Sequence, residues 1–194
     1  MSERRVSAIV LAGGRSSRFG RDKLAEPIDG RSLLDHAIDA VRPFAGEVLV
    51  VVAPGGRPAV QPGVTVVHDR SPFEGPLAGL LAGLGIAGAS VVLVSAGDMP
   101  DLVPAVVERL LASVDQDGCE AAVLAHDGRA GPLPLVIRRD PAREAAVRLV
   151  GTGERRLGAL LDALATTVVA EVVWRPLDPL GLSLRDIDTP ADLP

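Results

Sequence analysis

The 194-residue sequence has one cysteine, Cys119, so a single chain can form neither a disulfide nor a cysteine-cluster metal site. Aromatic side chains are scarce as well, with three phenylalanines, one tryptophan and no tyrosine. The formal net charge of -5 opposes binding to a phosphate backbone, and few rings are present for bases to stack on. These features predict a cytoplasmic protein without a nucleic-acid partner.

Long apolar spans are also missing, although one uncharged stretch must be considered as a possible membrane-spanning helix. Residues 75–97 carry no charged side chain, and their number would suit a membrane-spanning helix. Glycines interrupt this stretch, and its spaced leucines give way to the β-branched run at residues 91–94, which favours a helix followed by a buried strand. The short apolar run after the N-terminal arginines ends in glycines and charge, so we expect neither a signal peptide nor membrane association.

Several catalytic signatures are absent. The glycine-rich loop at residues 11–23 contains neither the P-loop pattern G-x-x-x-x-G-K-[ST] nor the dinucleotide pattern G-x-G-x-x-G. No G-x-S-x-G nucleophile elbow occurs, and Cys119 has no neighbours that mark a nucleophile. Covalent catalysis is therefore disfavoured. The three histidines lack H-E-x-x-H spacing, and we interpret them as structural or surface residues: His36, His68 and His126.

What the sequence does contain is an alternation of strand-like and helix-like segments. Short apolar runs typical of strands buried on both faces occupy residues 8–11, 48–52, 64–67 and 91–94. A helix is predicted over residues 32–41, because its apolar side chains share one face behind the N-capping Ser32. Pro104 marks the start of a later helix. Further strands are expected at residues 121–124, 133–137 and 168–174.

This alternation predicts an α/β fold, namely a three-layer α/β/α sandwich with a mostly parallel, Rossmann-like nucleotide-binding sheet. At this length we expect a single domain, residues 1–194. Ligands of such sheets sit beyond the carboxyl ends of the strands. Polar residues that directly follow an apolar run are therefore the candidates for function.

The first candidate is the loop after the first strand, where Gly13 and Gly14 precede several cations. Backbone N–H groups in a glycine-rich loop can cradle a phosphate, and Arg15, Arg18 and Lys23 add positive charge. A plain glycine turn flanked by solvated charges is the alternative.

Three carboxylates are further candidates. Asp98 follows the strand at residues 91–94 and is placed to hold Mg²⁺ against a triphosphate, because Mg²⁺ takes carboxylate and phosphate oxygens; its alternative is a helix cap or a turn. Asp69 follows the third strand and precedes Gly75–Gly79, for which close helix-to-sheet packing is the alternative. Asp188 lies near the C-terminus, with helix capping as its alternative.

Four segments, LAGGRSSRFGRDK, GPLAG, AGDMP and DIDTPADL, together resemble the MobA-like nucleotidyltransferases. The resemblance extends over nearly the whole chain and is closer to the guanylyl branch of that family than to its cytidylyl branch. It implies Mg²⁺-dependent transfer of GMP from GTP to molybdopterin, a phosphorylated pterin, with release of pyrophosphate. It also implies that residues up to about 100 bind the NTP and that the rest forms the acceptor side.

Matching the family's motifs residue by residue assigns roles in this sequence. The resemblance implies nucleotide contacts from Leu11, Ala12, Gly13, Gly14, Lys23, Asp69, Gly75 and Asp98. Lys23, Arg18 and Asp98 are the predicted catalytic residues, since they would neutralise charge during phosphoryl transfer. Asp98 and Asp188 are predicted to hold Mg²⁺, with Asp186 as an alternative to Asp188. Cations for the acceptor are expected from Arg129, Arg138, Arg139, Arg155 and Arg156.

Two departures from the family's pattern leave part of this interpretation open. Phe19 replaces a usual methionine, and Ala53 stands where the guanylyl branch often has an asparagine, so guanine and cytosine both stay open. The alternative enzyme is a cytidylyltransferase or another NTP transferase with a different phosphorylated acceptor. The alternative of another class is a non-catalytic nucleotide-binding protein that delivers a cofactor. The protein partner expected for this chain is a molybdoenzyme or a cofactor-insertion protein.

Overall fold

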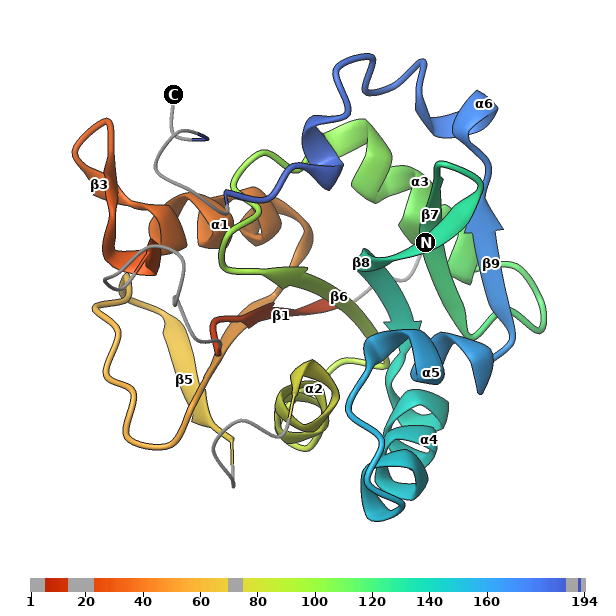
Figure 1. Ribbon diagram of the computed structural model, residues 1–194, viewed down its shortest axis with the longest axis horizontal. Coiled ribbons are helices and arrows are strands. Elements are labelled where there is room, and N and C mark those ends of the chain that lie inside the picture. Colours follow the sequence, from red (N-terminus) through yellow and green to blue (C-terminus); the bar gives the residue numbers. More distant parts are fainter. Residues whose placement is uncertain (1–5, 14–22, 70–74, 188–191, 193–194) are drawn as a thin grey trace.

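A seven-stranded, mostly parallel sheet forms the centre of the molecule. The computed structural model describes residues 6–13, 23–69, 75–187 and 192 (Figure 1). The strand order is β5-β4-β1-β6-β8-β7-β9. The strands are β1 (Val6–Leu11), β4 (Glu47–Val52), β5 (Val64–His68), β6 (Val91–Ala96), β7 (Ala121–His126), β8 (Arg129–Arg138) and β9 (Thr166–Val169). Neighbouring strands are parallel, except that β8 runs antiparallel to both β6 and β7.

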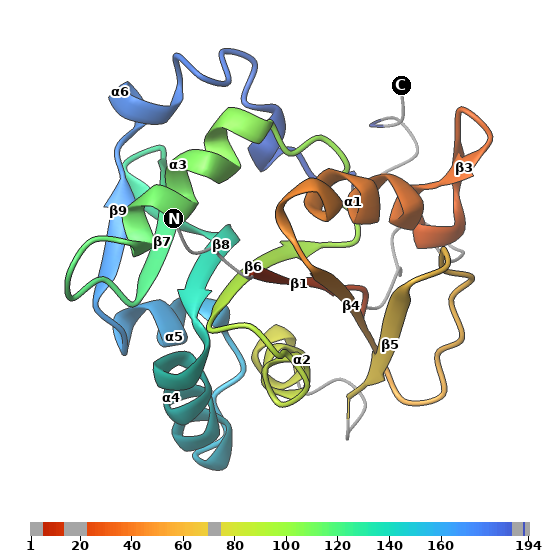
Figure 2. The same cartoon turned by 180° about the vertical axis from the view of Figure 1, so that it is seen from behind.

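Helices cover both faces of this sheet. They are α1 (Leu33–Val41), α2 (Pro76–Leu84), α3 (Pro104–Val114), α4 (Arg139–Gly151), α5 (Leu157–Asp162) and α6 (Glu171–Trp174). Short 3-10 turns are η1 (Lys23–Ala25), η2 (Arg42–Phe44) and η3 (Leu182–Leu184), and a small ribbon pairs β2 (Pro27–Ile28) with β3 (Arg31–Ser32). Helices α1 and α3 lie on one face and α2, α4 and α5 on the other (Figures 1 and 2). The predicted three-layer α/β/α sandwich is confirmed.

Each face of the sheet has its own apolar core, which explains why the central strands are continuous apolar runs. Alternate residues of β1 and β4 join the cluster under α1 and α3 or the cluster under α2, α4 and α5. Strands packed on both faces are almost continuously apolar, and the buried Ser7 of β1 and Ser95 of β6 are exceptions. The prediction that residues 64–67 are buried on both faces is wrong, because β5 is an edge strand with Thr65 and His68 exposed. Helix α1 begins where predicted, because the Ser32 hydroxyl accepts a hydrogen bond from the Asp35 backbone N–H (3.1 Å).

The uncharged stretch at residues 75–97 forms α2 and then β6, as predicted. Helix α2 lies very close to the sheet at Gly83, where an added Cβ would be 2.8 Å from Ile9 Cδ1 and 3.1 Å from Val51 Cγ2. Among the described residues, no helix has the length and apolar character needed to cross a membrane. Gly83 therefore allows α2 to pack closely against the sheet.

The predicted strand over residues 168–174 is wrong beyond Val169. The chain leaves β9 there and forms the short helix α6. Trp174 is fully buried, and its indole Nε1 donates to the Ala125 carbonyl oxygen (2.8 Å). One helical turn returns this side chain to the end of β7, which an extended strand with alternating faces would not do. Burial of the single tryptophan thus overrides the strand propensity of the neighbouring valines.

The order of the strands reverses between β1 and β6. From β1 the chain moves through α1 to β4 and then β5, whereas α2 carries it back to β6 on the other side of β1. Such a switch point opens a crevice beyond the carboxyl ends of the two strands, where α/β proteins bind ligands. The crevice lies beyond Leu11 and Ala96, the last residues of β1 and β6.

Candidate functional site

The segments that follow β1 and β6 meet at this switch point. The Gly97 N–H donates to the Leu11 carbonyl oxygen (2.9 Å), which extends the pairing of β1 and β6 by one residue. On the other side, the Ala12 N–H donates to Val51 O of β4 (2.7 Å). Leu11, Ala12 and Gly13 therefore lie between the carboxyl ends of β4 and β6, where the sequence predicts a nucleotide.

Two predicted catalytic residues form an ion pair in this crevice. Lys23 Nζ lies 2.6 Å from Asp98 Oδ2, although the residues are 75 positions apart in the sequence. The two side chains are 17% and 20% exposed. A cation and an anion that are both partly exposed therefore lie in contact beyond the carboxyl end of β6.

The helix-cap alternative for Asp98 is wrong. Helix α3 begins at Pro104, and its N-cap is Val103, so Asp98 lies outside the helix. It sits in the turn after β6, where Met99 N donates to Ala96 O (3.2 Å), and its side chain extends to Lys23. The carboxylate is thus available for an ionic role.

Gly97, directly before Asp98, is tightly packed. A Cβ at this position would lie 3.2 Å from both Leu24 methyl carbons and 3.3 Å from Leu34 Cδ1. Its φ lies outside the left-handed region, so the backbone conformation itself does not require glycine. The absence of a side chain lets the turn of Asp98 approach the η1 turn that carries Lys23.

Gly13 has a different environment. Among the described residues, the atoms nearest to an added Cβ are Ala53 N at 3.6 Å and Val52 C at 3.9 Å, which are ordinary contacts. Neither φ nor these neighbours require a glycine here. A glycine without such a structural reason at the end of a strand fits a position where a ligand approaches the backbone closely.

Asp69 lies at the same edge of the sheet, on the side of α2. It follows β5 and donates its N–H to Val52 O (2.9 Å), and its Oδ2 would be 3.9 Å from a Cβ placed on Gly79. Strands β5 and β6 are three positions apart in the sheet, so Asp69 and Asp98 follow strands separated by about 14 Å. An extended ligand such as a nucleotide can reach both, whereas a single ion cannot.

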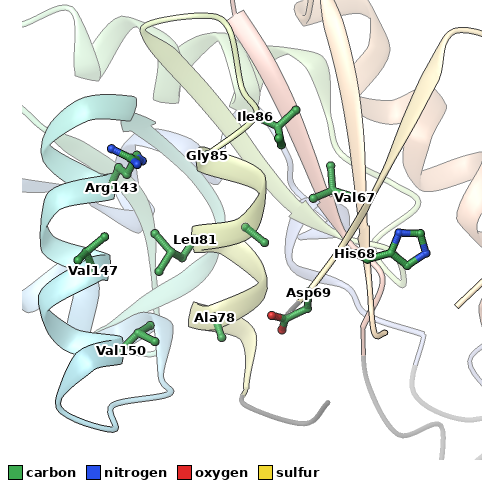
Figure 3. Close-up of a pocket in the computed structure, with 11 residues that line it drawn as sticks. Val67, His68, Asp69, Ala78, Leu81, Gly85, Ile86, Arg143, Val147 and Val150 are labelled. Atoms are coloured by element: carbon green, nitrogen blue, oxygen red, sulfur yellow. The ribbon is translucent and has the colours of Figure 1, made fainter. Parts of the chain in front are cut away.

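A cavity of about 430 Å³ lies beside Asp69 between β5, α2 and α4 (Figure 3). Its walls are mostly apolar, with Arg143 of α4 at the end opposite Asp69. Of the predicted site residues that the structure describes, Asp69 alone lines it. The cavity is therefore separate from the crevice that contains Lys23 and Asp98.

Gly75 opens helix α2 in a conformation that favours glycine. Its φ of 85 and ψ of 172 lie in a region occupied almost solely by glycine. An added Cβ would be 2.8 Å from Arg155 Cβ and 2.9 Å from Arg155 O, and that carbonyl accepts from Leu77 N (3.2 Å). Gly75 therefore joins the first turn of α2 to the loop before α5.

Gly75→Ala is expected to lower the free energy of unfolding by at least about 1–3 kcal/mol, the cost of the strained backbone, with the contact to Arg155 added. Gly63→Ala is the matched control, since Gly63 has a φ of 81 but no atom within 4 Å of its added Cβ. It should lose about 1–2 kcal/mol. Urea denaturation measures both, and equal losses would contradict the tight contact with Arg155.

Three predicted site residues lie outside the described residues: Gly14, Arg18 and Asp188. The same holds for Arg15 and Phe19. Asp186 is described and follows the η3 turn.

Two of the arginines expected on the acceptor side are at the opposite edge of the sheet. Arg138 pairs with Val91 at the amino end of β6, and its guanidinium donates to Cys119 O (2.9 Å) and Val114 O (2.8 Å). Arg139 donates its N–H to Ser90 O (2.8 Å). The length of β6 separates them from Asp98 by roughly 15 Å. Both predictions are wrong, because β8 is antiparallel and carries its last residues away from the crevice.

The remaining arginines that were predicted for the acceptor side are exposed. Arg129 begins β8, at the sheet edge where β7 ends. Arg155 lies in the loop before α5, and its carbonyl oxygen accepts from Leu77 N in the first turn of α2. Arg156 forms an ion pair with Glu154 (2.8 Å), and hydrogen bonds from the Arg156 side chain and from the Arg156 and Arg155 backbones lower the pKa of Glu154 to about 2.

The histidines occupy the structural and surface positions that were predicted. The imidazole Nε2 of His36 lies 2.9 Å from Ile28 O, and that of His68 lies 3.0 Å from Gly56 O. His126, Asp127 and Glu171 form a surface group in which the side-chain atoms able to bind a metal ion lie within 4.8 Å of one another. Glu171 also approaches the Arg175 guanidinium at 3.8 Å. This group was not recognised in the sequence, because Glu171 is 45 positions from His126.

Sequence reasoning also missed the residues that hold the Asp98 turn. Ile187 N donates to Asp98 O (2.9 Å), and the Arg185 guanidinium contacts the Asp101 carboxylate. The C-terminal segment was predicted to supply the Mg²⁺ ligand Asp188, with helix capping as the alternative, but its contacts with the Asp98 turn were not predicted. Its apolar Ile187, set between charged residues, was the available signal that this segment packs against the core.

Comparison with known proteins identifies the class of this chain. Residues 8–168 match the model of the MobA-like NTP transferase domain. A protein of Chloroflexus aggregans (strain MD-66 / DSM 9485) named probable molybdenum cofactor guanylyltransferase is 35% identical, over 97% of this chain and 91% of that protein. A protein of the same name from Mycobacterium tuberculosis (strain ATCC 25618 / H37Rv) is 37% identical, over 89% of this chain and 87% of its own length.

Solved structures have the same architecture. Molybdopterin-guanine dinucleotide biosynthesis protein A from Archaeoglobus fulgidus superposes with a TM-score of 0.79 at 26% identity, over 96% of this chain and 94% of that chain. The 2-C-methyl-D-erythritol 4-phosphate cytidylyltransferase from Thermus thermophilus shares the fold, with a TM-score of 0.71 at 21% identity, over 95% and 94%. The chain belongs to the MobA-like NTP transferase family and is a nucleotidyltransferase.

Proposed function

We propose that this nucleotidyltransferase transfers GMP from GTP to molybdopterin in a Mg²⁺-dependent reaction and releases pyrophosphate. The observation that carries the proposal is the contact of Lys23 with Asp98 at the carboxyl ends of β1 and β6. Relatives named molybdenum cofactor guanylyltransferase, at 35% and 37% identity, support the donor and the acceptor. The product would be the guanine dinucleotide form of the cofactor.

In this reaction an oxygen of the acceptor's terminal phosphate attacks the α-phosphorus of GTP, and the bond to pyrophosphate breaks. The attacking phosphate is already anionic, so a strong general base is unnecessary. The protein's task is to align two anions and to offset their charge. Lys23 and Arg18 are the proposed cations, and the backbone from Leu11 to Gly14, together with Asp69 and Gly75, is proposed to hold the nucleotide.

The residues of the crevice suit Mg²⁺. The Asp98 carboxylate already holds a cationic group, the Lys23 ammonium, at 2.6 Å, and a carboxylate oxygen is a ligand that Mg²⁺ prefers. We propose Asp98 and Asp188 as its ligands. Bound there, the ion would offset phosphate charge in the transition state.

The test is pyrophosphate release from each of the four NTPs, with Mg²⁺ and with or without molybdopterin. Release that requires both GTP and molybdopterin supports the proposal. Release with CTP, or with another phosphorylated acceptor only, would identify the alternative NTP transferase. Nucleotide binding without release under every condition would favour the non-catalytic delivery protein.

The protein is expected to bind GTP more tightly than CTP, but by a small margin. Guanine presents N1–H and 2-amino donors, whereas cytosine presents an acceptor and one amino group, so the two bases need different partners. Ala53 lacks the side-chain amide of the guanylyl branch, which leaves backbone groups at residues 52–55 for that contact. A wrong base leaves buried polar groups unpaired at about 1–3 kcal/mol each. We expect GTP to bind about tenfold more tightly than CTP, equivalent to about 1.4 kcal/mol.

Calorimetric titration with GTP, CTP and ATP at saturating Mg²⁺ measures this preference. Ala53→Asn restores the amide of the branch and should widen the margin for GTP. CTP binding as tightly as GTP to the unmodified protein would assign it to the cytidylyl branch instead.

We also propose that residues 1–194 act as one domain, in which the part up to about residue 100 binds NTP. One continuous sheet that includes β1 and β9 supports this. A chain with a single cysteine needs no oxidising compartment, and we propose the cytoplasm as its location. A molybdoenzyme or a cofactor-insertion protein is the proposed recipient of the product.

A further inference from the structure

The segment at residues 178–187, here called the C-terminal strap, contacts the turn of Asp98 at three successive points. Ile187 N donates to Asp98 O (2.9 Å). The Arg185 guanidinium forms an ion pair with the Asp101 carboxylate. Val103 N donates to Ser183 Oγ (3.0 Å). The strap therefore runs antiparallel to residues 98–103 and fixes both ends of that loop.

The strap is itself firmly held at its start. Asp178 is almost fully buried, and its carboxylate accepts from Leu182 N (2.9 Å) and Ser183 N (2.8 Å). Burial alone would raise the pKa of Asp178, but the N–H donors of Ser183 and Leu182 outweigh it and lower the pKa. Asp178 therefore stays ionised and fixes Ser183, which is also fully buried.

The other end of the strap contacts the partner of Asp98. Ile187 is fully buried in a small cluster with Ile28 and Leu33, against which Leu24 also packs. Leu24 follows Lys23 in the η1 turn, and it closely approaches Gly97 as well. The strap thus touches the segment of Asp98 through hydrogen bonds and the segment of Lys23 through apolar packing.

We propose that the C-terminal strap positions Asp98 and Lys23 for nucleotidyl transfer, and that Arg185 is a positioning residue acting through Asp101. The proposal rests on the proposed function of the crevice. Asp98 lies on a loop, and loops have low local stability unless other segments restrain them. Small misplacements of reacting groups reduce the rate strongly.

Arg185 offers a clean test, because its ion pair is partly exposed. The Arg185 and Asp101 side chains are 43% and 34% exposed, and such surface pairs contribute little to global stability. A matched pair exists elsewhere: Arg31 and Asp39 lie 2.6 Å apart with side chains 45% and 40% exposed, outside the crevice. Arg31→Ala therefore reproduces the loss of such a pair without touching the strap.

The experiment compares Arg185→Ala, Arg185→Lys and Arg31→Ala with the unmodified protein. Hydrogen exchange measures the amides of residues 97–103 and 23–25, Mn²⁺ titration followed by electron paramagnetic resonance measures metal affinity, and pyrophosphate release gives kcat and KM for GTP. For Arg185→Ala we expect faster exchange in both segments, weaker Mn²⁺ binding and a kcat lowered by about tenfold, with KM for GTP changed less than twofold. Arg185→Lys should recover most of the kcat, and Arg31→Ala should match the unmodified protein.

The proposal would be overturned by exchange and Mn²⁺ binding in Arg185→Ala that equal those of Arg31→Ala. It would also be overturned if the loss of kcat only followed a comparable loss of folded protein at the assay temperature. Failure of the proposed function is distinguishable, because the unmodified protein would then release no pyrophosphate from GTP, whereas exchange and Mn²⁺ binding would still report on the strap.

Discussion

Asp98→Asn is expected to remove most of the turnover and to leave the fold intact. The side chain follows β6 beyond the sheet and contributes to neither apolar core, so an amide of the same shape should be accommodated. The amide removes the negative charge that faces Lys23 at 2.6 Å and that we propose to hold Mg²⁺. Loss of one such electrostatic group lowers kcat by about 10²–10³-fold, or about 3–4 kcal/mol of transition-state stabilisation.

The measurement is Mg²⁺-dependent pyrophosphate release, with thermal unfolding and circular dichroism to verify the fold. Asp39→Asn is the control, because Asp39 also forms an ion pair at 2.6 Å, with Arg31, but away from the crevice. Asp39→Asn should retain activity. Near-unmodified release by Asp98→Asn would exclude Asp98 as the metal-binding carboxylate.

The parts of the fold that the sequence predicts well are those determined by local patterns. The interior strands β1, β4 and β6 are mostly buried apolar runs, and α1 has one apolar face and a serine cap, so short windows of sequence contain the information. The same local logic identified the loops after β1 and β6. The alternation of strands and helices predicted the mostly parallel sheet, whereas the strand order with its switch point came from the structure.

The misplaced features depend on contacts between distant segments. Residues 133–137 were predicted as a strand, but their direction was not, and the antiparallel β8 moved Arg138 to the wrong edge for binding the acceptor. Val168 and its neighbours have strand propensity, yet burial of Trp174 against β7 ends the strand early. The contact of Ile187 with Asp98 spans 89 positions, and no local pattern encodes it.

Lys23→Ala is expected to have two effects of opposite sign. The first is weaker binding of GTP with little change for guanosine, because the proposed partner of Lys23 is phosphate. A charge-assisted contact of this kind contributes about 1.5–3 kcal/mol, equivalent to about a 10- to 150-fold increase in the Kd for GTP. Titration with GTP and with guanosine measures this effect, and equal losses for both ligands would contradict a phosphate contact.

The second effect follows from where the ammonium lies in the structure. Lys23 contacts Asp98 Oδ2 at 2.6 Å, so a metal ion that approaches this oxygen must compete with a fixed positive charge at close range. Removing the ammonium leaves the carboxylate open to a cation and removes the repulsion. We therefore expect Lys23→Ala to bind Mn²⁺ more tightly than the unmodified protein when no nucleotide is present, as measured by electron paramagnetic resonance.

Arg31→Ala is the control for both effects, since it also removes a cation that contacts a carboxylate at 2.6 Å but lies outside the crevice. It should change neither GTP nor Mn²⁺ binding. Lys23→Arg keeps the charge and should retain weak Mn²⁺ binding without nucleotide. In the unmodified protein, transfer of the Lys23 ammonium from Asp98 to a phosphate would make nucleotide and metal bind cooperatively, since each favours the arrangement that the other needs. Mn²⁺ binding that is equally weak in Lys23→Ala and in the unmodified protein would contradict competition for Asp98.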